Sequence, residues 1–128
     1  MLREHETSIR VRYEDADPGG FVHHSKYFVF FEIGRTELLR AAGEDYRRME
    51  SEGIFAVVVK ASCQYHKPAR FDDVLTIQTK VVRTTRARIE HAYLARRGSE
   101  IIATGNVTLT LVDRDGKVRR LPQEWLNP

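Results

Sequence analysis

Hydrophobic positions follow two different spacings along this chain, and the change between them comes near residue 54. Between Ser25 and Gly43 the apolar side chains recur every three or four residues, which is the spacing of one face of a helix. That face comprises Tyr27, Phe30, Phe31, Gly34, Leu38 and Ala41. Ser25 is a typical N-cap residue, and Ala42-Gly43 is a typical helix end. Because Gly34 has no side chain, the pattern also predicts that a sheet approaches the helix closely at this position.

Elsewhere the spacing is that of β-strands. Alternation of apolar residues in the runs 8–13, 55–65, 75–81, 89–96 and 101–111 predicts five strands. The positions expected on one face are Ile9, Val11 and Tyr13; Phe55, Val57, Val59, Ala61, Cys63 and Tyr65; Leu75, Ile77, Thr79 and Val81; and Ile101, Ala103, Val107, Leu109 and Leu111. Residues 44–52 predict a short polar helix closed by Gly53, and Asp115-Gly116 predicts a hairpin turn.

The last four predicted strands follow one another with no helix between them, so their pairing is expected to be antiparallel. One long apolar helix and one antiparallel sheet predict an α+β fold in which the sheet wraps around the helix. Because the chain has 128 residues, no internal repeat and no linker, residues 1–128 are expected to form a single domain.

Composition narrows the classes of function. A single cysteine, Cys63, excludes an intrachain disulfide and a multi-cysteine metal site, and it favours a reducing compartment. No run approaches the roughly 18 apolar residues of a membrane span, and the polar first ten residues lack the apolar centre of a signal peptide. We therefore expect a cytoplasmic protein. The net charge of +3 suits a nucleotide-bearing partner but is too small to predict nucleic-acid binding.

Ionisable side chains are concentrated in residues 14–24, EDADPGGFVHH, the loop that leads into the long helix. Pro18 favours an extended backbone at Asp17, and the two glycines that follow permit close approach of a ligand. From local sequence alone Asp17 is also a common turn residue. Its neighbours Asp15 and Glu14 are expected to be structural.

The segment from Val11 to Glu37 resembles the hotdog-fold acyl-CoA thioesterases. It reads VRYEDADPGGFVHH to His24 and continues with Tyr27 and with FFEIGRTE over residues 30–37. The nearest branch is that of 4-hydroxybenzoyl-CoA thioesterase and the YbgC-like proteins. A D-x-D-x-x-G string followed by V-x-H and an aromatic helix is fairly specific. The order of helix and strands extends the resemblance over nearly the whole chain.

Carried over position by position, the resemblance implies that Asp17 is the catalytic carboxylate and His24 the histidine of the YbgC-like branch. Gly19, Gly20, His23 and Tyr27 are then expected at the substrate. His23 departs from the family, which usually has tyrosine or another aromatic residue there, so the acyl group stays undefined. The resemblance further implies homodimers with one continuous sheet, often joined into homotetramers, with the active site between subunits. No metal is expected, because the histidine spacing matches no standard zinc pattern.

Thioester hydrolysis suits these residues on chemical grounds. The leaving thiolate has a conjugate acid with a pKa near 8.5, taking cysteine as a guide, so it needs little help from an acid. Asp17 can attack the carbonyl directly or deprotonate water, and both routes stay open. N–H groups at the start of a helix can hold the oxyanion. We hypothesise that His24 orients Asp17, the water or the thioester, or protonates the thiolate.

Coenzyme A enters as part of the substrate rather than as a cofactor, and its phosphates require basic side chains. Among many basic residues, Arg83, Arg86 and Arg88 are preferred because arginine suits bidentate phosphate contacts. Acyl groups on acyl carrier protein are the alternative substrate, and a non-catalytic acyl-CoA-binding module is the alternative function. Cys63 is expected to be buried and inert.

Overall fold

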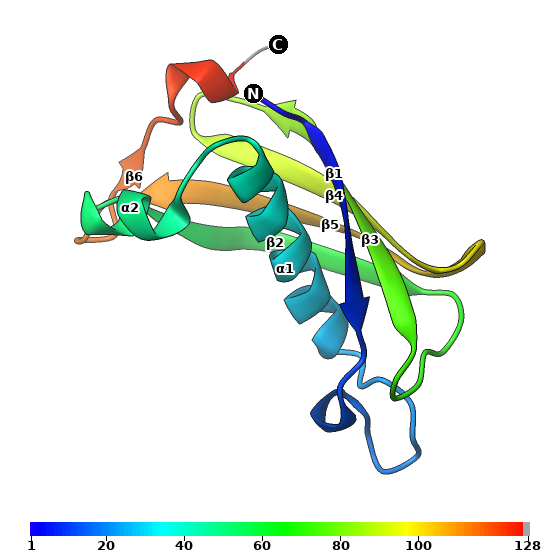
Figure 1. Cartoon of the computed structure of the whole chain (residues 1–128). Helices are drawn as coiled ribbons and strands as arrows, with labels where there is room; N and C mark the ends of the chain where they lie inside the picture. The colour runs from blue at the N-terminus through cyan, green and yellow to red at the C-terminus, as the bar shows by residue number, and fades with distance from the viewer. Residues whose placement is uncertain (127–128) are drawn as a thin grey trace.

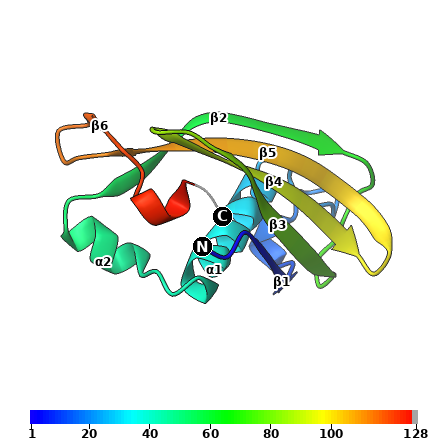
Figure 2. The same cartoon turned by 90° about the horizontal axis from the view of Figure 1, so that it is seen from above.

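The computed structural model describes residues 1–126 as a curved antiparallel sheet packed against one long helix (Figures 1 and 2). The strands are β1 (Glu4–Arg10), β2 (Phe55–Tyr65), β3 (Val74–Thr84), β4 (Arg88–Arg97), β5 (Glu100–Val112) and β6 (Val118–Arg119). Their order is β1-β3-β4-β5-β2, with β6 paired to β5, and every pairing is antiparallel. Helix α1 (Lys26–Ala41) lies in the concave face, and α2 (Tyr46–Ser51) follows it. The predicted α+β architecture is confirmed.

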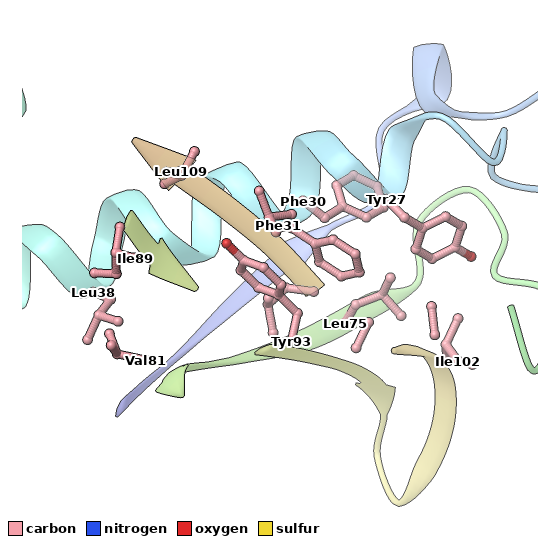
Figure 3. Packing of buried hydrophobic residues seen from close by; sticks show 14 of the residues in the cluster. Tyr27, Phe30, Phe31, Leu38, Leu75, Val81, Ile89, Tyr93, Ile102 and Leu109 are labelled. Carbon is pink, nitrogen blue, oxygen red and sulfur yellow. The ribbon is translucent and has the colours of Figure 1, made fainter. Parts of the chain in front are cut away.

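Small residues let α1 and the sheet approach closely. A Cβ atom on Gly34 would lie 2.5 Å from Thr79 Oγ1 and 2.9 Å from Ile77 Cγ2, so the close approach predicted at Gly34 is confirmed. Along the same helix face Phe31 is fully buried and stacks on Tyr93, with ring centroids 4.5 Å apart. Figure 3 shows Phe31 of α1 facing Tyr93, which comes from β4. This packing fixes where the two ends of α1 lie relative to the sheet.

Several predicted elements are confirmed. Strands β2, β3 and β4 match the predicted runs to within one residue at most ends, although β3 continues to Thr84. Helix α1 ends at Ala42-Gly43 as expected, with Gly43 at a φ of 87°. The hairpin turn before β6 has Gly116 at a φ of 83°, a conformation that favours glycine.

Local hydrogen bonds explain two wrong boundaries. The first strand ends at Arg10, and the next residues turn because Arg12 N donates to Asp15 Oδ2 at 2.8 Å. Tyr13, predicted to face the core, is therefore 81% exposed. The short helix α2 starts at Tyr46 rather than residue 44, since the Asp45 side chain accepts from Arg48 N and caps it.

Several positions that were expected to face the core are exposed instead. A register shift between β4 and β5 at Ala95/Arg96 turns Ile101 outward, where it is 47% exposed, and buries Ile102 instead. The valines at 57, 58 and 59 are all exposed, because β2 is an edge strand and has a register shift near Val58. Ala41 is exposed at the end of α1. Among residues 1–126, no helix is long and apolar enough to cross a membrane.

Candidate active site

Asp17 lies in a tight turn that holds one carboxylate oxygen and leaves the other free. Its Oδ1 accepts hydrogen bonds from Gly19 N at 2.9 Å and Phe21 N at 3.2 Å. The backbone closes the same turn, because Asp17 N donates to Phe21 O at 2.7 Å. Within residues 1–126 no hydrogen bond involves Oδ2. The carboxylate is thus fixed in orientation with one oxygen available to a reactant.

The glycines after Pro18 are needed for this turn. Gly20 has a φ of 87°, a left-handed conformation that side chains rarely adopt. A Cβ atom on Gly19 would lie 3.2 Å from Asp17 Oδ1, which is tight enough to disturb the carboxylate. Both residues therefore act here on the shape of the turn.

The start of α1 is organised by His23. Ser25 occupies the predicted N-cap position, but its side chain caps no helical N–H group. Instead Ser25 N donates to His23 Nδ1 at 3.2 Å, and Ser25 Oγ lies 2.8 Å from the same nitrogen. Lys26 N donates to the carbonyl oxygen of His23 at 2.9 Å. The other N–H groups of the first turn have no partner within the helix, as in any α-helix.

His24 and Tyr27 share a cleft next to this helix start. Its lining residues are Val22, His24, Tyr27, Tyr65, His66, Lys67 and Pro68. The Tyr65 hydroxyl donates to the carbonyl oxygen of His24 at 3.1 Å, which ties the end of β2 to the entrance of α1. Burial raises the pKa of the Tyr27 hydroxyl. Asp17 is not among the lining residues of this cleft, and no hydrogen bond within residues 1–126 joins it to His24.

Sequence patterns did not identify Tyr65 and His66 as site residues, and they gave Lys67 and Arg70 only as two of many basic candidates for contacts with coenzyme A. Tyr65 was assigned to the core because it continues the alternation of β2, yet it is exposed. The Lys67-Pro68 pair after the strand is a signal for a loop at the site. Arg70 is a further basic residue in this region, with its guanidinium group 4.5 Å from the centroid of the Phe21 ring.

The preferred arginines lie at the other end of the molecule. Arg88 pairs with Thr110 near the end of β5, whereas Tyr65, beside the site, pairs with Ala103 near its start. Arg83 near the end of β3 and Arg86 in the turn from β3 to β4 lie at that same distant end (Figure 1). Within one subunit, therefore, the structure does not bring these arginines together with Asp17.

Asp15 has a structural role, and the Cys63 thiol is disfavoured as a reactive group. Asp15 is 1% exposed and holds the turn before Asp17 through Arg12 N, in keeping with the structural role expected for it. Burial raises the pKa of the Cys63 thiol, which disfavours the reactive thiolate. Cys63 is only partly buried, rather than fully buried as expected.

Several known proteins are similar to this chain in sequence, in fold or in both. The acyl-CoA thioesterase YbgC of Haemophilus influenzae is 35% identical over 106 residues, which cover 82% of this chain and 78% of that protein. A structure described as a probable thioesterase from Bartonella henselae is 35% identical, with a TM-score of 0.89 over 93% of this chain and 99% of that chain. The complex of a 4-hydroxybenzoyl-CoA thioesterase mutant with 4-hydroxybenzoyl-CoA has a TM-score of 0.86 at 19% identity, covering 96% of each chain, and so shares the fold.

A family of proteins also matches the chain directly in sequence. Residues 19–103 match the thioesterase superfamily, and this segment runs from the turn after Asp17 through the first residues of β5. The matched segment is more than half of the chain, and it contains α1 with the close approach at Gly34. Sequence and hotdog fold agree, and the chain belongs to the thioesterase superfamily.

Proposed function

We propose that this protein hydrolyses acyl-CoA thioesters to a free acid and coenzyme A, with Asp17 as the reacting carboxylate. One observation carries the proposal: two backbone N–H groups hold Asp17 Oδ1 while Oδ2 makes no hydrogen bond within residues 1–126. Because the hydrogen bonds to Oδ1 fix the orientation of the carboxylate, Oδ2 can meet the carbonyl carbon of each substrate molecule in the same geometry. The names of the relatives as thioesterases support this activity.

Asp17 can act by either of two balanced routes. As a nucleophile, Oδ2 forms a bond to the thioester carbon, the C–S bond breaks to release the thiolate, and water then hydrolyses the mixed anhydride. As a base, Oδ2 takes a proton from the water molecule that attacks the carbonyl. In both routes N–H groups in the first turn of a helix such as α1 stabilise the oxyanion. His24 orients the reacting groups from the neighbouring cleft or protonates the thiolate.

A dimer would complete this site. Strand β2 is an edge of the sheet with exposed Val57, Val58 and Val59, and such an edge readily pairs with another chain. A groove between α1 and β2, lined by Val29 and Val58 among others, extends the apolar surface. Two-fold pairing of these edges would run the two β2 strands antiparallel. We therefore propose a homodimer with a continuous sheet, and pairing of two dimers would give the homotetramer.

Antiparallel pairing would also give the distant arginines a role. It would place the end of one subunit that carries Arg83, Arg86 and Arg88 alongside the end of its partner that carries Asp17. All three arginines are exposed, and no ion pair within residues 1–126 involves them. We propose that they bind the phosphates of coenzyme A at the partner's site.

A pair of substrates tests the arginines. The double variant Arg86→Ala, Arg88→Ala should raise KM for an acyl-CoA by about tenfold, because each substitution removes charge-assisted hydrogen bonds to a phosphate. The same acyl group on N-acetylcysteamine has no nucleotide, so its KM should stay unchanged. Equal changes for both substrates would remove the arginines from phosphate binding. The variant Arg47→Ala, an exposed arginine on α2, is the matched control.

Thiol release from a panel of thioesters tests the function itself. The panel contains short, long and aromatic acyl-CoAs together with the matching acyl carrier proteins. Turnover of an acyl-CoA is the expected result, and preference for the carrier-protein thioesters would replace the proposed substrate class. Tight binding of one thioester without turnover would instead support a non-catalytic binding module. Cytoplasmic location stays a prediction from the sequence.

A further inference from the structure

A second cavity lies between the sheet and the end of α1 that is farther from Asp17. Leu38, Val81, Ile89 and Leu109 gather there, as Figure 3 shows. The other walls come from α1, α2, β2, β4, β5 and segments near both ends of the described chain. These residues are Met1, Leu2, Arg35, Thr36, Leu39, Ala42, Tyr46, Met49, Ala56, His91, Leu111 and Trp125. The lining is almost entirely apolar, and it includes no residue of the Asp17 loop.

Two buried polar atoms on this lining lack hydrogen-bond partners. His91 is 6% exposed and Trp125 is 4% exposed, and neither His91 Nδ1 nor Trp125 Nε1 has a partner within residues 1–126. Buried polar atoms in folded proteins are nearly always paired, because an unpaired one loses its hydrogen bonds to water. The unpaired Trp125 N–H group can only donate, so it requires an acceptor.

A cation borders the same cavity. The Arg35 side chain is 15% exposed, and its one ion pair within residues 1–126 is to the exposed Glu32 at a distance of 3.8 Å. Burial, followed by the charges of Arg35 and Arg3, lowers the pKa of His91 to about 3. His91 is therefore neutral at pH 7 and can donate one hydrogen bond. A largely buried arginine side chain whose acidic partner is this distant favours an anion nearby, and Arg35 lines this cavity as well as the groove between α1 and β2.

We propose that this cavity binds an apolar carboxylic acid, with its carboxylate beside Arg35 and His91 and its carbon chain among Leu38, Ile89 and Leu109. Arg35 supplies charge-assisted hydrogen bonds to the carboxylate. The apolar walls bury the chain, whose transfer from water contributes about 0.8 kcal/mol per methylene. This site is separate from the proposed thioester site and does not depend on it, because the two lie at opposite ends of α1.

Binding requires an outward movement of the chain ends. With Met1, Leu2 and Trp125 in place, the free space is about 50 Å³, enough for a few water molecules. The segment with Trp125 is held to the rest of the chain by backbone contacts such as Leu121 N to Arg86 O at 2.9 Å. An acid of several carbons would displace Trp125, Met1 or Leu2. Because Trp125 is the only tryptophan of the 128 residues, its fluorescence reports directly on this cavity.

The test is a fluorescence titration of the full chain with octanoate and, separately, with 1-octanol. Octanoate should change the Trp125 emission saturably, and 1-octanol should bind about tenfold more weakly because it lacks the charge. Arg35→Met should weaken octanoate binding by a similar factor. Ala56→Leu and Thr36→Leu, which fill the cavity from two walls, should abolish the response. Ala92→Leu, on the opposite face of β4 from His91, should not change it.

Three results would overturn the proposal. The first is no saturable response of the wild-type protein to octanoate. The second is an equal affinity for 1-octanol, which would remove the carboxylate from recognition. The third is a response that survives both filling variants but disappears in Asp17→Asn, which would place octanoate at the thioester site. Thermal unfolding is measured first to confirm that each variant is folded. If only one of the two cavity-filling variants is folded, that variant alone is enough for the test.

Discussion

His91 is the residue whose protonation should couple most strongly to folding. Its pKa is lowered from 6.5 to about 3, mainly by burial and then by Arg35 and Arg3. The folded state therefore excludes a proton that the unfolded state binds below pH 6.5. The contribution of neutral His91 to the free energy of unfolding is fully present above pH 6.5. It decreases as the pH falls towards 3, by about 1.4 kcal/mol for each pH unit.

Denaturant unfolding at pH 7.5 and pH 5.5 measures this dependence. His91→Leu should reduce the loss of unfolding free energy between the two pH values by about 1.4 kcal/mol. His66→Gln, which changes an exposed histidine, should leave the loss as it is in the wild-type protein. An unchanged loss in His91→Leu would show that other groups cause the acid sensitivity.

Single residues also show how far local sequence predicts a site. Asp17 was identified through the resemblance of residues 11–37 rather than from its local sequence. Gly20 was expected to permit close approach of a ligand, and its φ of 87° shows that it also shapes the turn. The role of His23 at Ser25 N was not predictable, since serine at an N-cap normally supplies its own oxygen. Ile101 was misassigned because one register shift exchanges the two faces of a strand.

Among the elements, β2 and α1 are joined at the site by one side chain. The Tyr65 hydroxyl donates to the His24 carbonyl oxygen at 3.1 Å, and a tyrosine hydroxyl, with an ordinary pKa of about 10, is protonated at neutral pH. Tyr65→Phe removes this bond and keeps the ring. The loop that carries His24 should then become looser at the helix entrance.

Steady-state kinetics with an acyl-CoA measure the effect of Tyr65→Phe. We expect kcat to fall about two- to tenfold, which corresponds to the net free energy of one hydrogen bond. Tyr13→Phe, an exposed tyrosine outside the cleft, is the matched control and should keep the wild-type rate. An unchanged kcat in Tyr65→Phe would show that this bond does not position the site.

Element boundaries were predictable where apolar spacing alone decides them, as in α1 and β2. The predicted boundaries were wrong where a side-chain hydrogen bond sets the end of an element, as at Asp45 and Asp15. The long contact between Tyr65 and His24 joins residues 41 positions apart. Such contacts depend on how the sheet curves around the helix, which spacing along the chain does not encode.

At the scale of the whole molecule, the exposed valines of β2 identify the surface that pairs in the proposed dimer. Val58→Glu places a charge in the centre of this edge and should convert the dimer to a monomer, measured by light scattering after size-exclusion chromatography. Ser8→Glu on β1, the opposite edge strand, should leave the dimer intact. A Val58→Glu variant that stays dimeric would exclude pairing through β2.

The fold and the family were predictable from the sequence because the helix stripe, the strand order and the segment from Val11 to Glu37 all agree. The proposed arrangement of the site across two subunits was less accessible from the sequence. Arg83, Arg86 and Arg88 lie far from Asp17 within one chain, and only an assembly would bring these groups together. A single sequence defines the residues of such a site without fixing which subunit contributes each one.

The proposed reaction depends on one atom, Asp17 Oδ2, which makes no hydrogen bond within residues 1–126. The most direct test compares kcat for an acyl-CoA between the wild-type protein and Asp17→Asn, which keeps the size and the Oδ1 acceptor of the side chain. Asp72→Asn, an exposed aspartate outside the turn, is the control. We predict that kcat falls by about two orders of magnitude or more in Asp17→Asn, with substrate binding retained. Wild-type turnover in this variant would contradict the account.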